Sequence, residues 1–390
     1  MISRTAEKEL NLLSDQFKAV AVIGPRQSGK TTLVREVFKD RPYANLENPD
    51  LRKFALEDPR GFLSAYPKGA ILDEIQRAPE LFSYLQQILD ESKVNGLFIL
   101  TGSNNFLLQE SISQSLAGRV GYLFLLPLSL EEIPEKETGS NQLMVKGGYP
   151  ALYNEKIDVA RYYANYIRTY IERDVRLLKN INDLYTFERF LRLCAGRIGQ
   201  LLNMSSLGIE VGVDVKTIGS WIGVLEASFV VFRLQPWHKN FNKRVVKMPK
   251  LYFYDTGLAC ALLGIGSPDQ LTLHPFRRSL FENMVILEVL KNLFNKGSSS
   301  KLFFWRDNVG NEIDMLLDHG QGHIPVEIKS GQTISDDFFK GIHFWNKLTK
   351  TDGGFVVYAG NIAQNRSNGI KVLPFNQIAD IFKNADQPQI

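Results

Sequence analysis

Residues 24–31, GPRQSGKT, have the spacing G-x-x-x-x-G-K-T of a phosphate-binding loop. The segment directly follows the apolar run AVAVI and precedes a helical pattern, so it should join a strand to a helix. Its two glycines allow the backbone to curl until the N–H groups and the helix N-terminus face a phosphate. A glycine turn without a ligand is the alternative interpretation. We expect the nucleotide to be held by Gly24, Pro25, Arg26, Gln27, Ser28, Gly29, Lys30, Thr31 and Thr32.

A second motif, GAILDE at residues 69–74, supplies acidic groups to the same site. Lys30 should reach the β- and γ-phosphates, and the Thr31 hydroxyl should hold Mg²⁺. Asp73, at the end of an apolar run, would complete the Mg²⁺ shell through water, and Glu74 would orient and polarise the attacking water. The two motifs in this order predict an enzyme that hydrolyses a nucleoside triphosphate with Mg²⁺ as cofactor. The sequence contains no N-K-x-D motif for reading guanine, which favours ATP.

Two further residues are candidates for the same crevice. Asn104 follows the apolar run GLFIL and could contact the γ-phosphate or the attacking water, as could Ser103 or Thr101. A plain turn after a strand is the rival interpretation. Arg119, in SLAGR, could stabilise charge on the transferred phosphoryl group, and such an arginine often comes from a neighbouring subunit of a homo-oligomer. A surface arginine capping a strand is the alternative.

The C-terminal third contains acids and a lysine with the spacing of a metal-dependent nuclease site. Asp314 lies in NEIDMLL, Glu327 follows it by thirteen residues in PVEIKSG, and Lys329 follows two residues later. If the two strands pair, these side chains can share one face, because alternate residues point the same way. Two carboxylates could then bind Mg²⁺ while the lysine positions a water. Glu282, on the preceding helix, is available as a further acid. A nuclease-like fold without activity remains the alternative.

Glycine spacing in residues 205–228 predicts a helix-turn-helix. Gly208 would allow close contact between two helices, Gly212 would form the turn, and Ile218 would anchor the second helix. The exposed face of that helix should carry Lys216, Thr217 and Ser220. The strands that follow could form a basic wing bearing Lys239, Lys243, Arg244, Lys247 and Lys250. Two interpretations remain: contact with the phosphates of double-stranded DNA, or a packing module between two other domains.

The composition is that of a globular protein, with 44% hydrophobic and 23% charged residues among 390. A net charge of +4 permits an anionic partner without requiring one. Cys194 and Cys260 have no paired spacing, which argues against a disulfide scaffold or a zinc site and favours buried thiols. The N-terminus lacks the apolar run of a signal peptide, and the longest apolar stretch is too short to span a membrane. We expect a cytoplasmic protein.

The order of expected elements predicts an α/β protein of several domains. Strands are expected over residues 17–24, 43–47, 69–75, 96–103 and 118–126, with helices over 29–38, 79–92 and 106–116 between them. This alternation predicts a parallel sheet with helices on both faces. A helix over 278–294 and strands over 302–307, 312–318, 324–330 and 353–360 are expected near the C-terminus. The predicted domains are a P-loop ATPase core (1–135), a helical lid or linker (136–200), a winged helix-turn-helix (201–262) and a restriction-endonuclease-like α/β domain (263–390).

The complete set of motifs resembles a group of prokaryotic AAA-type ATPases that carry a C-terminal domain of unknown function. The segments GPRQSGKTTL, LDEIQRAPELF, LTGSNNFLL, SLAGRV, YIERDV and EID…VEIKSG occur in the order typical of that group, and the resemblance covers essentially the whole chain. It implies an AAA-type core, a winged helix and a restriction-endonuclease-like domain, with ATP bound through Lys30, Thr31, Asp73 and Glu74. The sequence shows no clear second sensor arginine after the core, which leaves ring assembly open.

Overall fold

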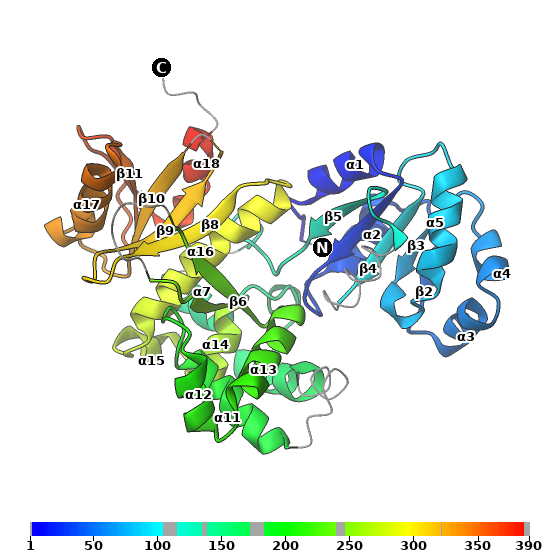
Figure 1. Ribbon diagram of the computed structural model, residues 1–390, viewed down its shortest axis with the longest axis horizontal. Coiled ribbons are helices and arrows are strands. Elements are labelled where there is room, and N and C mark those ends of the chain that lie inside the picture. The colour runs from blue at the N-terminus through cyan, green and yellow to red at the C-terminus, as the bar shows by residue number, and fades with distance from the viewer. Residues whose placement is uncertain are drawn as a thin grey trace.

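The N-terminal part of the chain forms a parallel β-sheet with the strand order β2-β3-β4-β1-β5 (Figure 1). The computed structural model describes residues 2–103, 115–134, 139–171, 183–238, 246–320 and 322–385. The strands are β1 (Ala19–Ile23), β2 (Tyr43–Asn45), β3 (Ala70–Asp73), β4 (Phe98–Gly102) and β5 (Val120–Phe124). Each lies inside a predicted strand segment, and every residue of β1, β3 and β4 is buried. The predicted parallel sheet is confirmed.

Helices cover both faces of this sheet, as the alternation of elements predicts. Val20 and Val22 of β1 pack with Leu33 on one face, whereas Ala21 packs with Leu85 on the other. Successive strand residues point to opposite faces, so a continuous apolar run serves both layers. The helices around this sheet are α1 (Glu7–Gln16), α2 (Lys30–Val37), α3 (Pro49–Glu57), α4 (Pro59–Ser64) and α5 (Leu81–Glu91).

A helical segment follows the first sheet (Figure 1). It contains α7 (Ser140–Lys146), α8 (Ala151–Asn154), α9 (Val159–Tyr166), a π-helical turn (Ile167–Ile171), α11 (Leu184–Ala195), α12 (Met204–Val211) and α13 (Val215–Ala227). The predicted helix over 106–116 lies mostly outside the described residues. Within the described part of the chain, no helix has both the length and the apolar character needed to cross a membrane.

Helices α12 and α13 meet through the glycines that the sequence singles out. A β-carbon on Gly208 would lie 2.8 Å from the Val213 carbonyl oxygen, so only glycine fits this contact without a shift. Gly212 ends α12 with a φ of 87°, in the left-handed region that favours glycine. Ile218 is fully buried. These three residues therefore occupy the positions that their spacing predicts.

The C-terminal part of the chain forms a mixed sheet with the strand order β12-β13-β11-β10-β9-β8-β6-β7. Its strands are β6 (Val231–Pro236), β7 (Lys250–Phe253), β8 (Lys301–Arg306), β9 (Glu312–Asp318), β10 (His323–Lys329), β11 (Gly354–Tyr358), β12 (Gln364–Asn365) and β13 (Ile370–Pro374). Its helices are α14 (Thr256–Leu262), α15 (Pro268–Thr272), α16 (Arg277–Asn295), α17 (Lys340–Thr349) and α18 (Asp380–Ala385). The predicted C-terminal helix and strands are confirmed.

The strands predicted as a wing belong to this second sheet. β6 pairs with β7 in antiparallel fashion and with β8 in parallel fashion, through Gln235 opposite Phe303 and Pro236 opposite Phe304. Backbone hydrogen bonds therefore connect the segment predicted as a winged helix to the segment predicted as the C-terminal domain.

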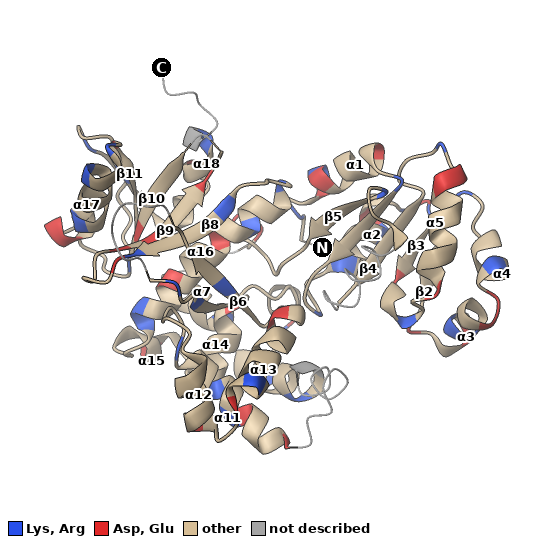
Figure 2. Ribbon diagram, viewed as in Figure 1, with Lys and Arg blue, Asp and Glu red and all other residues tan. Residues whose placement is uncertain are grey.

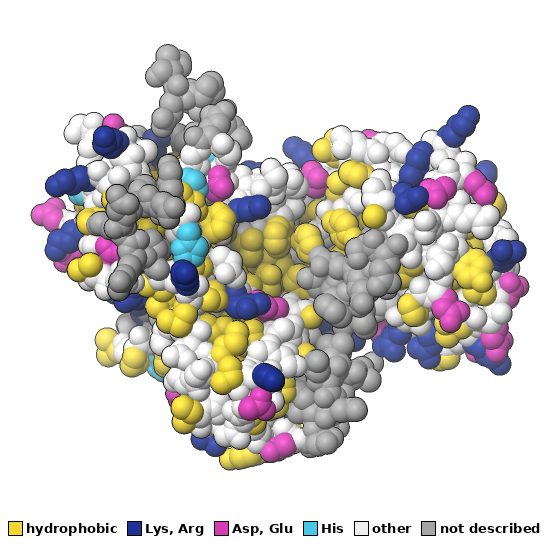
Figure 3. All heavy atoms as spheres, in the orientation of Figure 1, with side chains coloured by type: hydrophobic (Ala, Val, Ile, Leu, Met, Phe, Trp, Pro, Cys, Tyr) yellow, Lys and Arg dark blue, Asp and Glu magenta, His cyan; other side chains and the backbone are white. Residues whose placement is uncertain are grey.

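Helix α16 contacts both sheets. It packs against β5 of the first sheet and against β7 and β10 of the second. The ring of Phe294 at its C-terminal end contacts that of Phe124 of β5, with centroids 5.1 Å apart and planes tilted by 35°. Figure 3 shows hydrophobic side chains gathered in the hollow between the two lobes that these sheets form.

Both cysteines are buried and free. Burial raises the pKa of the Cys194 and Cys260 thiols, because removal from water disfavours the thiolate. The prediction of buried thiols is confirmed.

Glu288 of α16 should make the stability of the chain depend on pH. This buried carboxyl accepts the Leu130 N–H at 2.8 Å, and burial raises its pKa from 4.5 to about 7. The folded chain then binds the proton more tightly than the unfolded chain, so the free energy of unfolding should fall as the pH rises from about 4.5 to about 7. The whole change is on the order of 3 kcal/mol.

Urea denaturation at several pH values tests this prediction. Glu288→Gln keeps a hydrogen-bond acceptor for Leu130 but cannot ionise, so its stability should vary less with pH over this window. A variant with the same pH dependence as the original chain would contradict the raised pKa.

Candidate functional site

The predicted phosphate-binding loop joins β1 to α2 and has the curled backbone that this role requires. Gln27 and Gly29 have φ angles of 61° and 93°, in the left-handed region. A β-carbon on Gly24 would lie 2.1 Å from the carbonyl oxygen of Leu125, the residue after β5, so this close approach leaves room only for glycine. Ser28 Oγ is fully buried and has no hydrogen-bond partner among the described residues. A buried donor of this kind fits a phosphate oxygen as its missing partner.

Lys30 begins α2 and folds back over the loop. Its ammonium donates to the carbonyl oxygens of Gly24 and Pro25 at 2.9 and 2.7 Å. Burial lowers the pKa of Lys30 to about 8, although the charges of Glu74 and Asp73 act in the opposite direction. The lysine thus lies in a site of low polarity beside two acids, where an added phosphate would favour its charged form.

Asp73 lies at the C-terminal end of β3, surrounded by hydroxyl groups. Thr31 Oγ1 donates to both of its carboxylate oxygens at 3.1 Å, and Tyr43 donates to Oδ2 at 2.6 Å. Thr101 Oγ1 donates to Oδ1. In the described residues, no group of three or more His, Cys, Asp and Glu side chains could hold a metal ion. A carboxylate with an adjacent hydroxyl nevertheless suits Mg²⁺, which usually binds one or two carboxylates together with substrate phosphates.

Glu74, the next residue, has a strained backbone. Its φ of 55° and ψ of 44° are left-handed, a conformation that disfavours any residue with a β-carbon. Its carboxylate accepts from Gln76 at 2.5 Å and from Ser103 at 3.1 Å, and its N–H donates to Thr101 Oγ1 at 3.3 Å. Ser103 and Thr101 therefore contact the two acids of the site. Asn104, the preferred sequence candidate, lies outside the described residues.

Arg119 lies just before β5 and is paired within its own chain. Its guanidinium makes two contacts with Asp90 of α5, at 2.5 and 2.9 Å, and a third with the Ala117 carbonyl at 3.0 Å. This pair lowers the pKa of Asp90 and raises that of Arg119, because each charge favours the other. A role toward a neighbouring subunit would require Arg119 to leave this partner.

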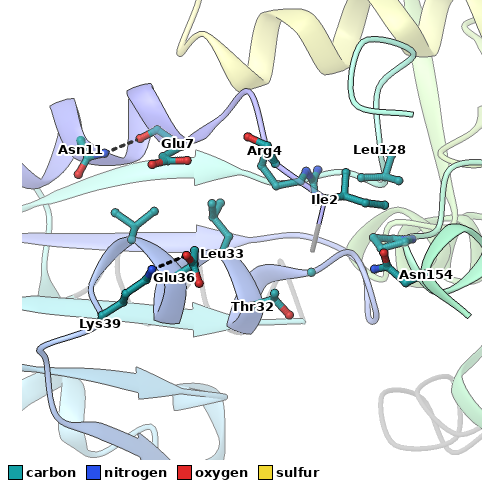
Figure 4. Close-up of a pocket in the computed structure, with 14 residues that line it drawn as sticks. Ile2, Arg4, Glu7, Asn11, Thr32, Leu33, Glu36, Lys39, Leu128 and Asn154 are labelled. Atoms are coloured by element: carbon teal, nitrogen blue, oxygen red, sulfur yellow. Dashed lines mark hydrogen bonds and ion pairs between the residues drawn. The ribbon is translucent and has the colours of Figure 1, made fainter. Parts of the chain in front are cut away.

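A cavity of about 420 Å³ lies beside the loop (Figure 4). Figure 4 shows its walls: the N-terminal segment at Ile2 and Arg4, helix α2 at Thr32 and Leu33, and Asn154. The remaining lining residues are Ser3, Glu7, Asn11, Gly29, Glu36, Val37, Lys39, Leu128 and Pro150. The motifs give no signal of this cavity, because its walls come from four segments that are distant in the sequence and meet only in the fold.

Helix α9 also reaches the loop. Tyr162 donates a hydrogen bond of 2.7 Å to Gln27 Oε1, and its ring contacts Tyr149 and Tyr166. The helical segment after the first sheet is therefore connected directly to the phosphate-binding loop.

Three of the predicted C-terminal residues converge at a second cavity, of about 360 Å³. β9 and β10 pair as predicted, and the Lys329 ammonium lies 3.5 Å from Asp314 and contacts Glu327. Burial, with the nearby charge of Asp314, raises the pKa of Glu327 to about 8. Burial opposes ionisation of Asp314, but the charges of Lys329 and Lys250 prevail and lower its pKa.

Glu282 does not line this cavity, but burial raises its pKa, and the charge of Asp314 is close enough to act in the same direction. It accepts hydrogen bonds from Lys250 at 3.0 Å and from Tyr252 at 2.5 Å, and Lys250 also pairs with Glu312 at 2.6 Å. Lys250 is only 3% exposed. The prediction that Lys250 belongs to an exposed basic wing is therefore wrong, because its charge is neutralised inside the fold by two glutamates.

Three other basic residues of the predicted wing lie outside the described residues: Lys239, Lys243 and Arg244. Lys247 is exposed. Lys216, at the start of α13, is also exposed, but it lies beside Asp214, whose carboxylate caps that helix. Figure 2 shows basic and acidic positions interspersed over α11, α12 and α13.

The left-handed backbone of Glu74 should make the stability of the chain sensitive to which residue replaces it. Glu74→Gly and Glu74→Ala lose the same side-chain contacts, but only glycine adopts the left-handed conformation without strain. We expect Glu74→Gly to be more stable than Glu74→Ala by about 1 kcal/mol. Chemical denaturation of both variants measures the difference, and equal or reversed stabilities would show that the backbone at Glu74 is not strained.

Comparisons with known families divide the chain into three matched regions. Residues 16–134 match the AAA domain, residues 138–269 match a domain of unknown function (DUF8612), and residues 278–378 match another (DUF4143). A Walker-type ATPase of Pyrococcus abyssi aligns with a TM-score of 0.42 and 14% identity, over 67% of this chain and 96% of its own. RuvB of Thermotoga maritima aligns with a TM-score of 0.30 and 16% identity, over 60% and 90%.

Sequence relatives align with most of the chain. Uncharacterized proteins of Mycobacterium tuberculosis and Mycobacterium bovis are each 32% identical over 336 residues, which cover 85% of this chain and 75% of theirs. An uncharacterized protein of Haemophilus influenzae is 22% identical over 239 residues, or 57% of each chain. With the phosphate-binding loop and its acids, these matches show that the chain belongs to the prokaryotic family of AAA-type P-loop ATPases with a C-terminal domain of unknown function.

Proposed function

We propose that the chain hydrolyses ATP with Mg²⁺ at the site formed by Lys30, Thr31, Asp73 and Glu74. The observation that carries the proposal is the contact between the two motifs: Thr31 Oγ1 lies 3.1 Å from both carboxylate oxygens of Asp73. Thr31 and Asp73 would hold the metal ion between them. Bound there, Mg²⁺ would neutralise charge on the phosphate oxygens.

The protein groups have separate roles in this proposal. The Lys30 ammonium has three N–H donors, and two bind loop carbonyls, so the third is available to a phosphate oxygen. Backbone N–H groups of the loop would hold the other phosphates, as at other helix N-termini. Ser103 and Gln76 fix the Glu74 carboxylate, which would orient the attacking water and accept its proton.

The cavity of about 420 Å³ would take the nucleoside part of ATP. It borders Gly29 and Thr32, at the point where a nucleotide with its phosphates in the loop would continue. Apolar walls at Leu33 and Pro150 could contact a base, and Asn154 could donate to it or accept from it. In this arrangement the helical segment, proposed as a lid over residues 136–200, senses the nucleotide through Asn154 and Tyr162.

Two substitutions test this function. Lys30→Ala should lose ATP binding, because it removes the buried cation that faces the phosphates. Glu74→Gln should bind ATP but lower kcat at least roughly 100-fold, as expected for loss of a general base. ATP binding is measured by calorimetry and turnover by phosphate release. Lys53→Ala, which removes an exposed partner of Glu57, is the control. Unchanged turnover in Glu74→Gln would overturn the role given to that glutamate.

A second candidate function is metal-dependent cleavage of DNA in a C-terminal domain over residues 263–390. The convergence of Asp314, Glu327 and Lys329 at a cavity supports it, as does the order α16, β8, β9, β10, α17, β11. We infer that residues 201–262 would act as a winged helix-turn-helix that contacts duplex DNA through exposed lysines such as Lys216 and Lys247. The alternative is a regulatory ATPase switch for a protein partner, in which the nuclease-like domain is inert.

Nicking of supercoiled plasmid in Mg²⁺ or Mn²⁺ separates these alternatives. If the second site is active, Asp314→Asn and Lys329→Met should abolish nicking and leave ATP hydrolysis within about twofold of the original rate. Lys340→Met, at the rim of the same cavity but paired with exposed Asp337, is the matched control. Absence of cleavage by the unsubstituted chain would favour the switch.

A further inference from the structure

Arg4 connects the N-terminal segment to the phosphate-binding loop. Its Nη1 donates to the Ser28 carbonyl at 2.6 Å, and its Nη2 donates to the Leu126 carbonyl at 2.7 Å. Its Nε lies 3.1 Å from Glu132. The side chain is 7% exposed and lines the cavity beside the loop (Figure 4). One guanidinium therefore joins the loop, the end of the first sheet and the segment that follows it.

The contact with Ser28 fixes a peptide group that matters for phosphate binding. The Ser28–Gly29 peptide is planar and trans, so its C=O and N–H point in opposite directions. Because Arg4 binds the Ser28 carbonyl, the Gly29 N–H points in the opposite direction, away from the Arg4 guanidinium. A β-carbon on Gly29 would lie 3.4 Å from Arg4 Nη1, so the guanidinium is in contact with the loop at this residue.

Glu132 fixes Arg4 in turn. Its side chain is 1% exposed and also accepts from the backbone N–H of Ser129 at 2.9 Å and that of Thr5 at 2.7 Å. The Thr5 hydroxyl donates to the same carboxylate at 2.9 Å and accepts from Asn295 of α16 at 2.7 Å. The ion pair between Arg4 and Glu132 is buried, so moving either side chain away would leave a buried charge without its partner.

We propose that Arg4 is a positioning residue of the ATPase, which aims the Gly29 N–H at the bound phosphates. This inference rests on the phosphate-binding role proposed for the loop and goes beyond its sequence motif. A loop N–H binds the phosphates before and during the reaction alike, so losing its orientation weakens substrate binding more than the chemical step. Arg4 therefore acts on the KM for ATP rather than on kcat.

The test compares Arg4→Lys and Arg4→Ala with a control. Lysine keeps a cation beside Glu132 but lacks the planar fork that reaches two carbonyls and the carboxylate together. We expect the KM for ATP to rise roughly tenfold in Arg4→Lys and up to roughly 100-fold in Arg4→Ala, with kcat changed less than threefold. Arg233→Ala removes a comparable two-point pair, with Glu226 at 2.7 Å, and should leave the KM unchanged.

The outcomes separate the inference from the proposed function. If Lys30→Ala loses ATP binding while Arg4→Lys keeps the original KM, the inference about Arg4 is overturned and the ATP site stands. If Lys30→Ala still binds ATP, the proposed site itself fails. If Arg4→Ala does not fold, Arg4→Lys alone decides, because it retains the buried charge. An elevated KM for ATP in Arg4→Lys supports the inference. A fall in kcat at constant KM contradicts it.

Discussion

The burial of α16 between the two sheets is the constraint on which the rest of the structure depends. Its N-terminal half carries Glu282, which binds Lys250 and Tyr252 of β7. Its C-terminal half carries Glu288 and Asn295, which bind the first part of the chain. Polar groups on a buried helix are tolerated only with partners, so these contacts fix the rotation of α16 as well as its position. The two sheets are thereby held in one relative orientation.

The nucleotide site follows from the pairing of parallel strands. β4 lies between β1 and β3, and parallel pairing brings the C-terminal ends of all three strands to one edge of the sheet. Thr31 lies in the first turn of the helix after β1, and Asp73 ends β3, so residues 42 positions apart in the sequence come into hydrogen-bond contact. Arg4 and Glu132 then stabilise the loop from outside the sheet.

Most of the fold could be predicted because buried parallel strands appear in the sequence as apolar runs. The phosphate-binding loop GPRQSGKT follows one such run, and the acids of GAILDE end another. The convergence of Asp314 and Glu327 could also be predicted, since strand alternation and pairing suffice to bring them together. The buried environment of Lys250 could not be predicted from the sequence. Its neighbours in the sequence are basic, but the glutamates that neutralise it come from α16 and β9, and a local pattern does not reveal burial against distant segments.

The sequence by itself determined the strands, the phosphate-binding loop and the identity of the acids, because these depend on hydrophobic periodicity and on short motifs with a fixed local geometry. Only the tertiary structure decided which polar groups surround Asp73, where the cavity beside the loop lies, and that Arg4 supports Ser28. Each of these features joins segments that are far apart in the chain. Their contacts depend on how the helices and sheets pack against one another. Contacts between distant segments leave no repeating pattern in the local sequence, so they cannot be read from it.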